Sequence, residues 1–65
     1  MVYKYLMTQR PPMLGAMPMN GLEDIQEFSS PDRVPEYGRR VYAVLNYSRK
    51  LTDLEVYDYE LAPVQ

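Results

Sequence analysis

Apolar and polar side chains alternate in two stretches of this chain, the pattern of β-strands whose successive side chains point to opposite faces. In residues 2–8 (VYKYLMT) the alternation puts Tyr3, Tyr5 and Met7 on one face. Residues 39–48 (RRVYAVLNYS) carry apolar side chains on both faces, and this is the strongest strand signal in the chain. One face holds Val41, Ala43, Leu45 and Tyr47, and the other holds Tyr42, Val44 and Asn46. We therefore expect a central strand, covered on one side by a helix and on the other, in part, by a long loop.

A third stretch, residues 22–28, has an ambiguous pattern. Leu22, Ile25 and Phe28 recur every three residues, as on one side of a helix, and Asn20 is a candidate cap. This spacing favours one or two helical turns. The alternative is a short edge strand anchored by Ile25 and Phe28.

Near the carboxyl end, two signals mark the start of a helix. Thr52 and Glu55 form the S/T-x-x-E pattern of a capping box, and Leu51 and Val56 have the spacing of a hydrophobic staple. They predict a helix over 53–59.

The alternative for this region is a strand, because residues 56–61 also alternate. The tail ELAPV (60–64) is expected to pair as an edge strand, a position that tolerates Pro63.

Between the first two patterned stretches lies RPPMLGAMPMNG (10–21), which holds three prolines, two glycines and three methionines. Such a segment cannot be helix or strand throughout. We expect a lid over one sheet face whose outer edge is offered to a partner, because methionine serves both as core filler and as adaptable binding surface. The candidate binding residues are Pro11, Pro12, Met13, Leu14 and Met17. A second loop is predicted over 29–38.

Together these elements predict one α+β domain spanning residues 1–65: a small, mostly antiparallel sheet of about three strands with one or two short helices and a long Met/Pro-rich loop. A hydrophobic content of 46% and a net charge of −2 are typical of a folded chain rather than a disordered one. A domain of this length buries only about 60% of its unfolded surface, so its core is small.

The chain contains no cysteine and no histidine. It therefore lacks thiolate and imidazole groups for metal binding, nucleophilic attack or proton transfer. We expect a protein that is not an enzyme and that needs no cofactor or metal. The apolar run at the amino end is too short for a signal peptide, and no window approaches a membrane span, so we expect a cytoplasmic protein.

Charge is unevenly distributed along the chain. Residues 33–50 carry +5 − 1 = +4, residues 51–65 carry −4 and residues 1–32 carry −2. A nucleic-acid surface is one interpretation of the basic region, with tyrosine rings stacking on bases. Pairing of these arginines with the acidic helix is the other, and a pI near 4.9 favours it. The candidate nucleic-acid residues are Arg33, Arg39, Arg40, Tyr42, Arg49 and Lys50.

Three segments, YKYLMTQRPPMLGAMP, VYAVLNYSRKLT and DYEL, resemble those of short uncharacterised proteins encoded by Gram-positive gut bacteria. Those proteins look like a family within the large polyvalent protein-associated domains, which occur on conjugative elements and phages. The resemblance implies an accessory role in mobile-element biology, such as protecting or processing incoming DNA or modulating a host factor. It implies no catalytic residues.

We therefore expect a small non-catalytic protein-interaction module that binds another protein or a second copy of itself. A nucleic-acid-binding accessory that uses the basic region is the alternative.

Overall fold

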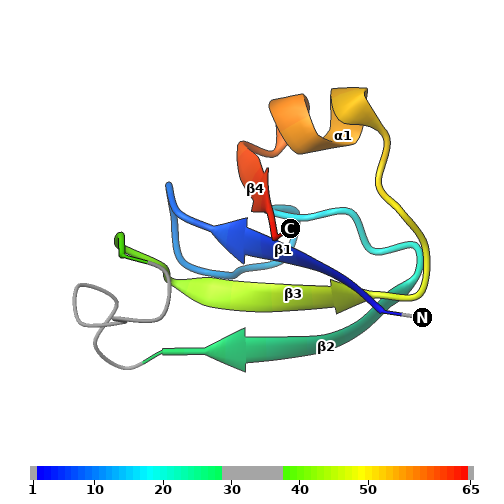
Figure 1. Ribbon diagram of the computed structural model, residues 1–65. Helices are drawn as coiled ribbons and strands as arrows, with labels where there is room; N and C mark the ends of the chain where they lie inside the picture. Colours follow the sequence, from blue (N-terminus) through cyan, green and yellow to red (C-terminus); the bar gives the residue numbers. More distant parts are fainter. Residues whose placement is uncertain (1, 29–37, 65) are drawn as a thin grey trace.

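The computed structural model describes residues 2–28 and 38–64. Within these ranges the chain forms one four-stranded antiparallel sheet and one short helix. The order across the sheet is β2-β3-β1-β4, so β1 and β3 are the central strands (Figure 1). The α+β class is confirmed, with four strands instead of about three and a single helix in the described part. In chain order the elements are β1 (Tyr3–Met7), β2 (Leu22–Glu27), β3 (Ala43–Tyr47), α1 (Asp53–Asp58) and β4 (Leu61–Pro63).

The two central strands are the two segments with the clearest alternation. They pair antiparallel, with Tyr5 opposite Leu45 and Met7 opposite Ala43, and these residues are buried. The expected alternation is wrong at the start of β3, where Val41 packs with Val44 while Tyr42 packs on the opposite face. Tyr42 lies in a bend that precedes the strand, so the regular two-residue period begins only at Ala43.

Residues 22–27 form the edge strand β2, so the helix favoured by their three-residue spacing is wrong. The register shifts between Leu22 and Asp24, which is the signature of a β-bulge. One extra residue in the strand returns Ile25 to the face of Leu22, and this bulge produces the apparent helical period. Phe28 lies outside that pattern and packs on the other face.

The helix α1 matches the sequence prediction to within one residue at its end. Thr52 is its cap: the Thr52 hydroxyl accepts the Glu55 N–H at 3.1 Å, and the Glu55 carboxylate accepts the Thr52 N–H at 2.9 Å. This is the complete capping box. No residue of α1 is fully buried, so local hydrogen bonds at its first turn carry much of its stability.

The main core lies on a single face of the sheet. Buried side chains from β1 and β3 meet Ala16 and Met17 of the long loop, and Val56 and Tyr59 of the α1 region pack against the same cluster. Helix and loop therefore cover the same face, in contrast to the expectation that they lie on opposite sides. This face carries the larger apolar cluster, and the two segments cover it together.

The opposite face carries a smaller apolar cluster. Leu6, Val41 and Val44 are buried there, with Phe28 and Ala62 packed against them. The tail forms β4 at the edge of the sheet beside β1, as expected of a strand that contains proline. The loop predicted over 29–38 lies outside the described residues except for Gly38.

Candidate functional site

The loop between β1 and β2 projects a sharp turn into solvent. The Ala16 N–H donates to the Met13 carbonyl at 2.9 Å, and Gly15 has a φ of +89°, the left-handed value that a type II turn requires at its third position. Leu14 takes the second position, at the corner of the turn, and is 90% exposed. A large apolar side chain is thus presented on a tight, hydrogen-bonded turn.

Just after the turn, the loop becomes part of the core. Ala16 and Met17 are buried, and Met17 is only 3% exposed. The Tyr47 hydroxyl donates to the Pro18 carbonyl at 2.7 Å in a buried hydrogen bond. Burial raises the pKa of Tyr47 to about 12, so this hydroxyl keeps its proton and remains a donor. The middle of the loop is therefore fixed to the sheet.

The end of the loop is held by Arg49, which follows β3. Its Nε donates to the Asn20 carbonyl at 2.8 Å, and its two terminal nitrogens contact the Glu55 carboxylate at 2.9 and 2.8 Å. The hydrogen bonds from Arg49 lower the pKa of Glu55 to about 2, and the hydrogen bond from the Thr52 backbone is the second cause. One arginine therefore connects the loop, the end of β3 and the first turn of α1.

The beginning of the loop is held by a second arginine. Arg10 forms an ion pair with Glu60, and its side chain also donates to the Tyr59 carbonyl at 3.5 Å. Glu60 has a φ of +54°, the left-handed conformation common just after a helix, and it turns the chain from α1 into β4. Both ends of the loop are thus connected to the α1 region.

Of the five loop residues expected to bind a partner, the structure exposes three and buries one. Pro11, Met13 and Leu14 are exposed and Pro12 is half-buried, whereas Met17 is a core residue. Met19, which is not among the five predicted binding residues, is also exposed. The exposed apolar side chains nearest each other in sequence, Met13 and Leu14, define the loop tip.

The basic residues expected to bind nucleic acid are divided between the two ends of β3. Arg39 and Arg40 precede the strand, and Arg49 and Lys50 follow it. At about 3.4 Å per residue, the span from Tyr42 to Ser48 is about 20 Å. Arg33 lies outside the described residues.

At the first end of β3, Arg40 lies 5.9 Å from the centre of the Tyr42 ring and donates to the Tyr42 hydroxyl at 3.2 Å. At the other end, Arg49 pairs with Glu55, as expected from the alternative interpretation of the charge pattern.

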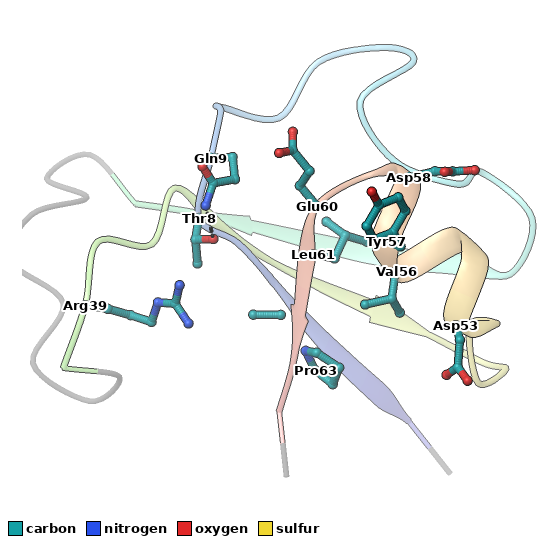
Figure 2. A pocket seen from close by; sticks show the side chains of 11 residues that line it. Thr8, Gln9, Arg39, Asp53, Val56, Tyr57, Asp58, Glu60, Leu61 and Pro63 are labelled. Carbon is teal, nitrogen blue, oxygen red and sulfur yellow. Dashed lines mark hydrogen bonds between the residues drawn. The ribbon is translucent and has the colours of Figure 1, made fainter.

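A groove lies between α1 and β4 (Figure 2). The sequence did not lead us to predict it. Residues of α1, all of β4 and the segment after β1 form its walls, and Tyr57 is 80% exposed there. A helical period in 53–59 could have indicated the exposed Tyr57, because Val56 and Tyr59 pack against the core cluster and Tyr57 does not. The lining residues are Thr8, Gln9, Arg39, Asp53, Val56, Tyr57, Asp58, Glu60, Leu61, Ala62 and Pro63.

Two further features are absent from the described ranges, 2–28 and 38–64. They contain no group of three or more His, Cys, Asp or Glu side chains arranged to hold a metal ion. None of their helices is long and apolar enough to cross a membrane.

Comparison with known proteins identifies a family. The sequence model of the family described as defence against restriction A C-terminal matches residues 1–65, the whole chain. No curated protein and no solved structure matches. The family is associated with phages and mobile elements, in agreement with the expected setting, although it is not named as a large polyvalent protein-associated domain.

Proposed function

Because the chain belongs to the defence against restriction A C-terminal family, we propose that it is a small, non-catalytic protein-interaction module that helps a phage or mobile element to protect its DNA from restriction. The observation that carries the proposal is Leu14, 90% exposed at the corner of a turn that is followed directly by the buried residues Ala16 and Met17. In this proposal the loop tip, Met13 and Leu14, contacts another protein in the cytoplasm.

The rigidity of the loop supports binding at its tip. Ordering a flexible loop upon association costs free energy, and a loop already held in its bound shape avoids that cost. Here Met17, the Tyr47–Pro18 hydrogen bond and the Arg49–Asn20 hydrogen bond hold the segment that follows the tip. Leu14 can therefore enter a partner's apolar pocket with little loss of conformational entropy.

The composition of the tip supports a protein partner. Met13 is 60% exposed beside Leu14, so two large apolar side chains face water together. Adjacent exposed apolar side chains mark interaction sites more often than scattered ones do, and methionine adapts its shape to varied partners.

The test is affinity capture of the full chain from an extract of host cells, with nuclease present, using wild type and two variants. Met13→Ser/Leu14→Ser is expected to lose the captured protein, with affinity falling about tenfold or more if the tip is a binding hot spot. Leu54→Ser removes an equally apolar exposed side chain from α1 and is the matched control, expected to retain the partner. Circular dichroism checks that all three proteins are folded. Undiminished capture by the folded loop variant would exclude the tip from the interface.

A second candidate is nucleic-acid binding through Arg39, Arg40 and Tyr42. The contact of Arg40 with the Tyr42 ring favours it, because such a pair offers both charge and a stacking surface. Binding of this kind weakens steeply as salt rises. Fluorescence anisotropy with single- and double-stranded DNA across a salt series tests it: Arg39→Ser/Arg40→Ser should reduce the salt slope, and no binding at low salt would reject this candidate.

A further inference from the structure

The groove between α1 and β4 has a net negative charge. Three carboxylates and one guanidinium line it, which gives −3 + 1 = −2. Glu60 is paired with Arg10, but Asp53 and Asp58 make no ion pair within the described part of the chain. Asp53 and Asp58 stand at opposite ends of α1 and both line the groove. With Glu60 neutralised by Arg10, the remaining lining charges are those of Asp53, Asp58 and Arg39, which gives −2 + 1 = −1, and the two aspartates are the carboxylates available to an incoming ligand.

The other wall of the groove is the edge of the sheet. The Val64 N–H donates to the Lys4 carbonyl at 3.0 Å, and in an antiparallel ladder the hydrogen-bonded pairs alternate. Ala62 and Val64 therefore direct their backbone groups toward β1, and Leu61 and Pro63 direct theirs away from it. Pro63 has no N–H to leave unpaired. Pro63 is exposed and so presents its carbonyl to an extended chain, whereas Leu61 is buried.

An exposed aromatic ring lies beside this edge. Tyr57 is 80% exposed, and Figure 2 shows it projecting from α1 near Val56 and Leu61. Tyrosine is enriched in protein interfaces, and the face of its ring attracts a cation such as the arginine guanidinium. The groove combines an apolar floor with groups that favour positive charge.

From these features we propose that the groove binds a positively charged, extended segment of a partner protein. The segment lies along the edge of β4, with Lys or Arg side chains near Asp53 and Asp58 and one guanidinium against Tyr57. This surface is separate from the loop tip, so the inference goes beyond the proposed function and does not depend on it.

The experiment is an NMR titration of the ¹⁵N-labelled full chain with a short peptide of alternating arginine and threonine at about 0.1 M salt, where exposed charges more than about 10 Å apart are largely screened. Saturable shifts are expected at Tyr57, Leu61 and their neighbours. Asp53→Asn/Asp58→Asn should weaken binding about fivefold, the effect of losing two exposed charge pairs. Tyr57→Ala, which removes an exposed side chain, should also weaken binding and keeps the test independent of any change at the start of α1.

The matched control removes the same charge from β2. Glu23 and Glu27 are exposed carboxylates on that strand, far from the groove across the sheet order. Glu23→Gln/Glu27→Gln should leave the affinity within about twofold of wild type, since distant exposed charges contribute little. Leu14→Ser should also leave it unchanged, which separates failure of this inference from failure of the loop proposal.

Three results would overturn the inference. The first is an equal loss of peptide affinity in Asp53→Asn/Asp58→Asn and Glu23→Gln/Glu27→Gln, which indicates unspecific attraction between charges. The second is equal binding of a peptide of alternating glutamate and threonine, and the third is a dimer that sedimentation detects without peptide and that Tyr57→Ala dissociates. The last would assign the groove to a second copy of this chain.

Discussion

At the scale of single residues, Arg49 and Glu55 each make hydrogen bonds to more than one segment of the chain. Glu55 accepts the Thr52 N–H at the start of α1 and receives both terminal nitrogens of Arg49, while Arg49 also holds the Asn20 carbonyl. Gly21 permits this arrangement, because a Cβ at that position would lie 3.1 Å from the Arg49 Cγ. The pair thus serves the helix and the loop together.

This pair predicts a pH dependence of stability. The Glu55 pKa falls from 4.5 to about 2 on folding, so its carboxylate stabilises the protein above the ordinary pKa and loses that contribution as pH falls from 4.5 toward 2. In thermal unfolding followed by circular dichroism, Glu55→Gln should lower Tm at neutral pH and flatten the fall of Tm across this acidic window. Glu23→Gln, at an exposed carboxylate of β2, is the control and should retain the wild-type profile. Parallel acid profiles in wild type and Glu55→Gln would contradict this role.

At the scale of elements, the long loop functions as a layer of the core. Its central residues pack on β1 and β3, and its polar anchors are backbone carbonyls that receive side-chain donors from the end of β3. A buried carbonyl that loses its donor is costly, because water cannot replace the hydrogen bond. The strength of the loop's attachment therefore depends on Tyr47.

Tyr47→Phe should destabilise the protein by about 1–3 kcal/mol, because the buried Pro18 carbonyl loses its donor. The loop should also open more often than in wild type. The Ala16 amide, which donates to the Met13 carbonyl, should therefore exchange faster with deuterium in the variant, with the amides of β1 as the reference. Urea unfolding and hydrogen exchange by NMR measure the two effects. Unchanged protection at Ala16 would show that packing of Met17 alone retains the loop.

At the scale of the whole molecule, a main apolar cluster on one sheet face and a smaller one on the other stabilise the described part of the domain. The main cluster gathers side chains from β1, β3, β4 and the loop on one sheet face, and a domain of this length has little stability to spare. Loss of one loop side chain should thus affect the entire domain and not the loop alone.

Met17→Ala should therefore destabilise the whole domain by about 2–5 kcal/mol, as is typical of a buried methionine. Met13→Ala, at an exposed position of the same loop, should change stability by about 0.5 kcal/mol or less. Urea unfolding monitored by tyrosine fluorescence and by far-ultraviolet circular dichroism should give coincident transitions for both variants. Separate transitions for loop and sheet would show that the loop unfolds independently.

The sequence by itself determined the features that depend on neighbours along the chain. The capping box of Thr52 and Glu55 is made within four consecutive residues, and it placed α1 correctly. Strict alternation located β1 and most of β3, and Pro63 indicated an edge strand because proline cannot donate to a ladder. Such signals act over a few residues and need no knowledge of distant partners.

Only the tertiary structure decided the features that require contacts between distant segments. The bulge in β2 depends on its pairing with β3, which gave Leu22 and Ile25 the spacing of a helix without its hydrogen bonds. Which methionines are buried depends on the path of the loop over the sheet, and the groove exists only where α1 meets the β4 edge. Residue type fixes the chemistry each side chain can perform, whereas burial and partnership are set by segments far away in the chain.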